Sequence, residues 1–321
     1  MLARRKALQV RTFALWREGP DLTARTRWFA SGRKGRTMSA RCRCRRPPRV
    51  LMAASLLLGL MSIALPAQPR RLVFHHGPGD RAHYDFSVSG RGVQEDRPVE
   101  FKLKVKCEVV FGRESGDREE IRASFISGTV DAESDGETAS RKISTYTVIY
   151  QVARDGRELA SKAAAGTLPE VPFAQMTFSP SDVGFLFGLP SRSVKPGDTW
   201  KCDKGLSGLG QRSGTTLTLL GEETFRGHHC LKIRSTSYLK VDETAPAAGN
   251  MRPRVQGWVS SAATILFDYE RGLVLSVEGT DKFSFTTIVD DPATGQPVAH
   301  KAVFVMNERS TLTSFRSQGT G

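Results

Sequence analysis

The sequence has few of the residues from which metal sites and disulfide networks are built. It holds five cysteines in 321 residues, and the three beyond residue 67 (Cys107, Cys202 and Cys230) show no Cys-x-x-Cys spacing. The six histidines include two His-His pairs, at positions 75–76 and 228–229. Adjacent residues of a strand point to opposite faces of a sheet, so neither pair can direct both rings to one ion. The usual zinc patterns are absent, and we predict neither a metal site nor a cofactor.

Short catalytic and nucleotide-binding motifs are also missing. Gly205-Leu-Ser-Gly-Leu209 has leucine where a nucleophile elbow needs its last glycine, and the glycines of this stretch lack dinucleotide or P-loop spacing. Asp131 to Gly136 resembles the start of a calcium loop, but Lys142 stands where a glutamate is required. Cys230 adjoins two histidines, which leaves open a hydrolase with a dispersed site. The sequence favours a protein without enzymatic activity and does not decide the matter.

Positive charge is concentrated at the N-terminus. The chain has 47 basic and 33 acidic residues and a formal net charge of +14. Residues 1–67 hold 15 of the basic and two of the acidic residues, which leaves 32 basic and 31 acidic residues for 68–321. The body is nearly neutral, so net charge gives no reason to expect a nucleic-acid partner.

The N-terminal region has the pattern of an export signal. A basic run, 41–49, precedes an uncharged apolar stretch from Val50 to Leu65, and a small residue, Ala67, follows. This pattern predicts a secretory signal peptide cleaved after Ala67, because the apolar stretch is shorter than the ~20 residues that span a bilayer. An uncleaved N-terminal anchor is the alternative. We expect a secreted or periplasmic protein, and residues 1–37 read as an over-extended gene start.

Beyond the leader, apolar residues alternate with polar ones. From Glu100 to Phe111, Phe, Leu, Val and Cys alternate with Lys and Glu, which is typical of a half-buried antiparallel strand. Stretches 121–130 and 143–152 read as further strands, separated by turn signals such as Asp155-Gly156. No long helical period is present, so we predict an all-β fold.

The second half repeats landmarks of the first in the same order. Three pairs of segments correspond: Pro78-Gly79-Asp80 with Pro196-Gly197-Asp198, Ile121 with Ile233, and Thr147-Val-Ile-Tyr150 with Thr264-Ile-Leu-Phe267. Small insertions between colinear landmarks are what a duplication leaves. We therefore predict an internal repeat that forms two tandem, similar antiparallel curved sheets, of the meander or half-barrel type. The repeats span 68–162 and 196–315, and 316–321 is a tail.

The join between the repeats, 163–195, differs from both. Ser179-Pro180-Ser-Asp182 has the pattern of a helix start, and we predict one short connecting helix that ends at Leu189-Pro190. Two interpretations stay open for its apolar residues: a plug that covers the sheet, or a lid over a hydrophobic ligand cavity. The lid candidates are Val183, Phe185, Leu186, Phe187 and Leu189.

Cys202 and Cys230 are candidates for a disulfide. They lie in the same repeat, 28 residues apart, and exported proteins meet oxidising conditions. One bridge with a buried thiol at Cys107 is the simplest arrangement for three cysteines, and three separate buried thiols are the alternative.

Two segments carry a family resemblance. Leu189 to Trp200, with its Pro-Gly-Asp-x-Trp strand start, and Phe267 to Leu275, with its Phe-Asp…Gly hairpin, resemble uncharacterised bacterial exported proteins. The hairpin is also similar to that of periplasmic lipoprotein-carrier half-barrels. The resemblance implies a curved antiparallel sheet that handles lipid or another apolar ligand, and it carries over no catalytic residue.

Together these patterns favour an exported, non-enzymatic β-protein that binds an apolar or lipid-like ligand or a partner in the cell envelope. A purely structural or interaction module of the envelope is the alternative, and a hydrolase with a dispersed site is a third possibility.

Overall fold

The computed structural model describes residues 69–318, apart from 75, 175, 206–211, 245–253 and 291–295. The side chains of 114–115, 203–205, 212–213 and 243–244 are likewise left undescribed. The predicted leader, 1–67, lies outside the described residues.

The described chain is nearly all β, as the alternation of apolar and polar residues predicts. Its main element is a 12-stranded antiparallel sheet with the order β6-β5-β3-β2-β1-β14-β13-β12-β11-β10-β9, in which β4 also pairs with β3. The first meander comprises β1 (Arg81–Gln94), β2 (Arg97–Ser115), β3 (Arg118–Ser134), β4 (Glu137–Ile143), β5 (Tyr146–Ala153) and β6 (Glu158–Ala165). The second comprises β9 (Thr199–Gly205), β10 (Arg212–Phe225), β11 (His228–Thr244), β12 (Arg254–Asp268), β13 (Leu273–Asp290) and β14 (Pro297–Arg316).

Both meanders belong to one sheet, which corrects the expectation of two tandem sheets. β1 pairs with β14 along its whole length, from Arg81 opposite Arg316 to Gln94 opposite Ala302. Separate sheets would leave an open edge on β1 and another on β14, and unpaired edge groups favour further pairing. Joining the two edges satisfies both rows of backbone donors and acceptors.

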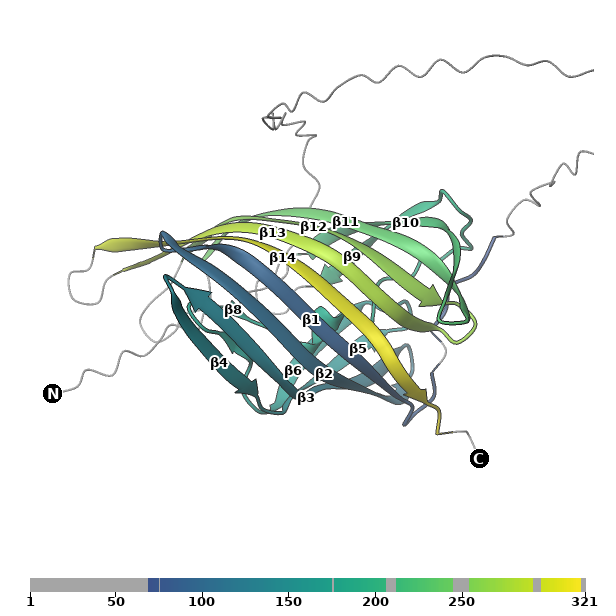
Figure 1. The fold of residues 1–321 in the computed structure, drawn as a ribbon. Helices are drawn as coiled ribbons and strands as arrows, with labels where there is room; N and C mark the ends of the chain where they lie inside the picture. Colours follow the sequence, from purple (N-terminus) through teal and green to yellow (C-terminus); the bar gives the residue numbers. More distant parts are fainter. Residues whose placement is uncertain are drawn as a thin grey trace, which may run out of the picture. The chain divides into compact units, whose positions relative to one another are not determined.

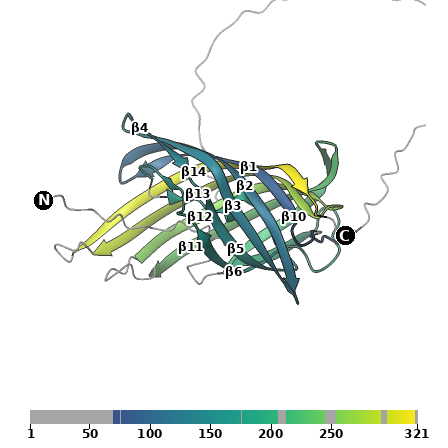
Figure 2. The ribbon, with the colours of Figure 1, turned by 90° about the horizontal axis from the view of Figure 1, so that it is seen from below.

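The sheet curves around the segment that joins the meanders (Figures 1 and 2). That segment contains the two-stranded hairpin β7 (Glu170–Val171) and β8 (Met176–Thr177). The large core cluster combines side chains from both meanders, such as Phe86 and Phe125 with Phe283 and Phe304. In the long strands the apolar residues of the alternating pattern therefore face inward, and most of the charged residues between them face outward.

The connecting helix is shorter than predicted. The segment forms a single 3₁₀ turn, η1 (Pro180–Val183). The turn begins with a capping box, in which the side chain of Ser179 and the side chain of Asp182 each accept a hydrogen bond from the other's backbone. Gly184 then takes a left-handed conformation, with φ of 72°, and ends the turn. From there to Leu189 the chain is not helical. The residues from Val183 to Leu189 are all buried or partly buried. No face of this segment is left fully to solvent, so its sequence does not need the polar face of an amphipathic helix.

Candidate functional site

A cavity lies between the connecting segment and the inner face of the second meander. Its volume is about 140 Å³. The connecting segment contributes Met176, Phe178, Gly184, Leu186 and Phe187, among others. The inner face contributes positions on β9 to β14, among them Thr215, Leu217, Ser235, Val259, Ser261, Ala263, Ile265, Val277, Phe283, Phe285 and Met306.

Strand register explains why the second meander is hollow. One cross-strand row of inward residues runs through Cys202, Thr215, Ser237 and Ser261, each opposite the next. The row continues to Asp281 on β13. Four of these five side chains are small. Four of the five, all except Ser237, line the cavity.

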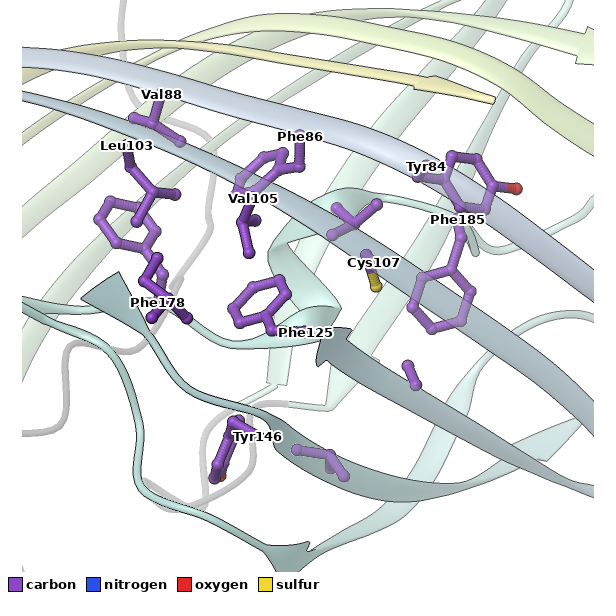
Figure 3. Close-up of a cluster of buried hydrophobic side chains, with 14 of the residues drawn as sticks. Tyr84, Phe86, Val88, Leu103, Val105, Cys107, Phe125, Tyr146, Phe178 and Phe185 are labelled. Carbon is purple, nitrogen blue, oxygen red and sulfur yellow. The ribbon is translucent and has the colours of Figure 1, made fainter. Parts of the chain in front are cut away.

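The matching row of the first meander is filled by large side chains. It runs through Tyr84, Cys107, Phe125 and Tyr146, again each opposite the next. Figure 3 draws these four side chains with Phe178 and Phe185 of the connecting segment, and all six belong to one buried cluster. Tyr84, Phe125 and Tyr146 are all at most 6% exposed. The first meander thus fills its own concavity, because aromatic rings stand where the second has hydroxyls and a thiol.

The register makes the two rows equivalent. Phe111 faces Ile121 in the first meander, and Leu219 faces Ile233 in the second. Each row lies four residues further along β3 and β11, at Phe125 and Ser237. A phenylalanine ring at this position in one meander corresponds to a hydroxymethyl group in the other.

The five predicted lid residues are buried or partly buried, and they divide between two cores. Val183 and Phe185 belong to the large cluster, which Leu186 packs against. Phe187 and Leu189 belong to the cluster of the second meander. The rings of Phe187 and Phe267 meet edge to face, with centroids 5.3 Å apart.

Of the five lid candidates, Leu186 and Phe187 line the cavity. The backbone directly after Phe187 is anchored twice, since the amide of Leu189 donates to the carbonyl of Asp155 at 2.7 Å and the indole of Trp200 donates to the carbonyl of Gly188 at 3.0 Å. The segment therefore plugs the first meander and covers the cavity of the second.

Sequence reasoning did not find the inner wall of the cavity. Thr215, Ser235, Ser237, Ser261 and Ala263 lie at inward positions of predicted or plausible strands but are small or polar. The available signal was a run of small residues with period two, Ser235-Thr-Ser237 and Ser261-Ala-Ala263, in strands whose other inward residues are apolar. Only the register shows that these runs lie side by side.

Two hydroxyls at this wall, one lining it and one beside it, have no hydrogen-bond partner among the described residues. Thr215 is 3% exposed and Ser237 is 8% exposed, and they face each other across β10 and β11. The Oγ1 atom of Thr215 and the Oγ atom of Ser237 are both buried without a partner. A buried hydroxyl without a hydrogen bond destabilises a fold by about 1–3 kcal/mol.

The disulfide expected between Cys202 and Cys230 does not form. Both side chains are buried, and neither is part of a disulfide. Cys202 faces Thr215 on β10, whereas Cys230 faces Glu223 on the same strand. At about 3.3 Å a residue, that separation of eight residues is far beyond the reach of a disulfide. Closeness in sequence suggested the bridge, but β10 lies between the two strands and offsets them along its length.

The residues around Cys230 do not form a nucleophile site. Nδ1 of His228 lies 3.5 Å from Oδ2 of Asp268. The thiol of Cys230 donates to the carbonyl of Glu223 at 3.3 Å. Burial raises the pKa of Cys230, and the nearby charges of Glu223 and Asp268 raise it further. A reactive cysteine needs a lowered pKa, so this environment opposes thiolate formation.

The part of the chain that the structure describes offers neither a metal-binding group of side chains nor a membrane-spanning helix. No three or more His, Cys, Asp or Glu side chains there are grouped closely enough to hold a metal ion. No helix among the described residues has the length and apolar character that a membrane crossing requires.

The chain has little detectable similarity to known proteins. No family model matches it, and no curated protein matches it. Among solved structures it is similar to lipovitellin, in a structure titled "Lipid-protein interactions in lipovitellin", with 13% sequence identity and a TM-score of 0.41. The match covers 77% of this chain but only 26% of lipovitellin. A likeness at this TM-score does not establish a common fold, and no function is inferred from it.

Proposed function

We propose that this chain is an exported binding protein that holds an apolar or lipid-like ligand in the cavity between its connecting segment and the second meander. The observation that carries the proposal is the contrast between the two rows of inward residues. Tyr84, Phe125 and Tyr146 fill the first meander, while Thr215 and Ser261 leave the second open. Protein interiors are otherwise packed without voids of this size.

The size of the cavity limits what fits inside it. An apolar cavity of about 150 Å³ is large enough for benzene, and this one measures about 140 Å³. A single ring or a short acyl segment therefore fits with the connecting segment in place. A longer chain needs movement of Leu186 and Phe187, which cover the cavity. In the proposal these two residues act as the lid.

Export and duplication belong to the same proposal. The basic and apolar runs before residue 68 support a cleaved signal peptide, and N-terminal sequencing of exported material tests this. Equivalent register in the two meanders supports a duplication, after which one copy kept a filled concavity and the other an open one. The resemblance to lipoprotein-carrier half-barrels suggests the same general role.

A matched pair of variants tests ligand binding. Ala263 lines the cavity, and its neighbour Ala262 is exposed on the outer face. We expect Ala263→Leu to weaken binding of ethylbenzene, a single-ring probe of the size that fits, at least tenfold in calorimetric titration, and Ala262→Leu to leave it unchanged. Native mass spectrometry of protein purified from its source should show a bound small molecule. No probe binding by the wild-type protein, together with a clean apo mass, contradicts the proposal.

A structural or interaction module is the second candidate, and the packing of the first meander favours it. That meander buries its inner face completely against Phe178 and Phe185. If the cavity takes up no probe, both meanders serve only as scaffold, and the outer face becomes the functional surface.

A further inference from the structure

We infer that the cavity selects a neutral amphiphile, whose hydroxyl or carbonyl group bonds Thr215 and Ser237 while its apolar part fills the space under Leu186 and Phe187. This inference rests on the proposed function and specifies the class of ligand. It is carried by two buried hydroxyls that face each other on neighbouring strands and have no hydrogen-bond partner in the described part of the chain.

These hydroxyls are placed at the wall of the cavity. Thr215 lines it directly. Ser237 lies between Thr215 and Ser261 in the same cross-strand row, and both of those neighbours line the cavity. A hydroxyl can donate one hydrogen bond and accept others. The pair can thus bond either an alcohol or a carbonyl oxygen, and neither bond requires a charged ligand.

Apolar side chains make up much of the remaining lining. Leu217, Val259, Ile265 and Val277 also line the cavity, together with the aromatic side chains of the connecting segment. A ligand that fills this region loses contact with water, so its one polar group needs a partner within the protein. Among the described residues at or beside the cavity, Thr215 and Ser237 are those whose hydroxyl oxygens are fully buried without a hydrogen-bond partner.

An anionic head group fits this end of the site less well. Asp281 follows Ser261 in the same row, and its side chain lines the cavity. Asp182 and Glu308 line it as well. Each of these residues has interactions of its own, but Oδ1 of Asp281 is buried without a hydrogen-bond donor among the described residues. The field of these carboxylates disfavours a further anion and leaves room for a ligand that donates a hydrogen bond, such as an alcohol. A fatty acid in its ionised form is therefore a poorer ligand than the corresponding alcohol.

Two probes of nearly the same shape test the inference. Ethylbenzene and 2-phenylethanol differ by one hydroxyl and suit a cavity of this volume. We expect the Thr215→Val/Ser237→Ala double variant to bind 2-phenylethanol roughly tenfold more weakly than the wild-type protein, since one or two hydrogen bonds are lost. The affinity of the double variant for ethylbenzene should stay the same or rise, because this apolar probe forms no hydrogen bond with the two hydroxyls and gains nothing from their presence. Calorimetric titration measures both affinities on the full chain.

A neighbouring pair supplies the control. Thr216 and Thr236 face each other one residue along, on the outer face of the sheet, and Thr216→Val/Thr236→Val should change neither affinity. The single variant Thr215→Ser keeps the hydroxyl and should keep most of the affinity of the wild-type protein for 2-phenylethanol. These variants distinguish loss of hydrogen bonding from loss of folding.

The outcomes separate this inference from the proposed function. If neither probe binds the wild-type protein, the apolar cavity site itself is wrong. If ethylbenzene binds and the double variant leaves the affinity for 2-phenylethanol unchanged, the cavity is apolar throughout and the role of the two hydroxyls is overturned. An equal loss of affinity for both probes in the double variant also overturns the inference, since that result reflects altered packing of the cavity.

Discussion

Gly79 and Gly197 occupy the same structural position in the two meanders. Their φ angles are 89° and 91°. The amide of Gly79 donates to the carbonyl of Phe111, and the amide of Gly197 donates to the carbonyl of Leu219, each at 2.7 Å. The aspartate that follows each glycine accepts a backbone hydrogen bond from the residue three positions before it. The Pro-Gly-Asp motif thus ties the entry to the first strand of a meander to the second strand.

Substitution of either glycine should destabilise the fold. A side chain at a φ near 90° is strained, and we expect Gly79→Ala and Gly197→Ala each to lower the free energy of unfolding by about 1–2 kcal/mol. Space is not the cause at Gly197, since no atom lies within 4 Å of an added Cβ. Gly214 is equally open but lacks the left-handed φ, so Gly214→Ala is the control. Denaturant unfolding measures all three, and equal stability of the three variants would contradict the assignment.

The carboxyl group of Asp80 should make stability depend on acidic pH. Burial alone raises its pKa, but hydrogen bonds from the amides of Gly77 and Gln318, and the charge of His76, outweigh burial and lower the pKa overall. A lowered pKa in the folded state adds stability above the unfolded pKa, and this stability is lost as the pH falls through the folded pKa. Unfolding measured from pH 7 to 2 should show this loss in the wild-type protein.

Asp80→Asn should remove most of that dependence. At pH 7 we expect the variant to be about 1–3 kcal/mol less stable, and the difference should shrink as the pH falls toward 2. Asp198→Asn should show the same sign with a smaller amplitude, because Asp198 is more exposed, although hydrogen bonds from Arg192 and Lys195 lower its pKa too. Parallel pH profiles for wild type and Asp80→Asn would refute this role.

The strands were predictable because their chemistry is local. Alternation from Glu100 to Phe111 places Phe101, Leu103 and Val105 inside β2, and all three are at most 3% exposed. Two of the repeated landmarks also coincide in register: the Pro-Gly-Asp turns, and Ile121 with Ile233. The third is displaced by two residues, because Tyr150 faces Ile121 whereas Ile265, rather than Phe267, faces Ile233.

The single sheet and the cavity were not predictable because both depend on distant pairing. β1 meets β14 across more than 200 residues of sequence, and no local pattern records such a pairing. The cavity results from small side chains, Thr215, Ser237 and Ser261, brought together from three strands. In sequence each looks like an ordinary interruption of an apolar pattern, and only the register makes them neighbours.

The cysteines should behave as buried thiols without a disulfide. Burial raises the pKa of Cys107 to about 12, and Cys202 and Cys230 are also buried. We expect iodoacetamide at pH 8 to leave all three unmodified in the folded protein, since the thiolate is the reactive form. After unfolding in guanidinium without a reductant, all three should be modified. A Cys202–Cys230 peptide that resists modification until reduction would contradict the structure.

The ring of Phe267 should be a main support of the lid. It is fully buried and meets the rings of Phe74 and Phe187 edge to face, with centroids 5.6 Å and 5.3 Å away. Phe267→Ala should lower the free energy of unfolding by about 3–5 kcal/mol, since it removes a buried ring and leaves a cavity. Phe173 is 37% exposed, so Phe173→Ala is the matched control and should cost about 1 kcal/mol or less.

The same substitution connects stability to the lid. Loss of the Phe267 ring removes the partner of Phe187 and so loosens the segment from Gly184 to Leu189, whose other anchors are the backbone bonds at Gly188 and Leu189. We expect faster amide hydrogen exchange at Leu189 in Phe267→Ala than in Phe173→Ala, and faster entry of ethylbenzene into the cavity. If exchange at Leu189 changes no more than in the rest of the sheet, Phe267 stabilises the core alone and the lid is held by other contacts.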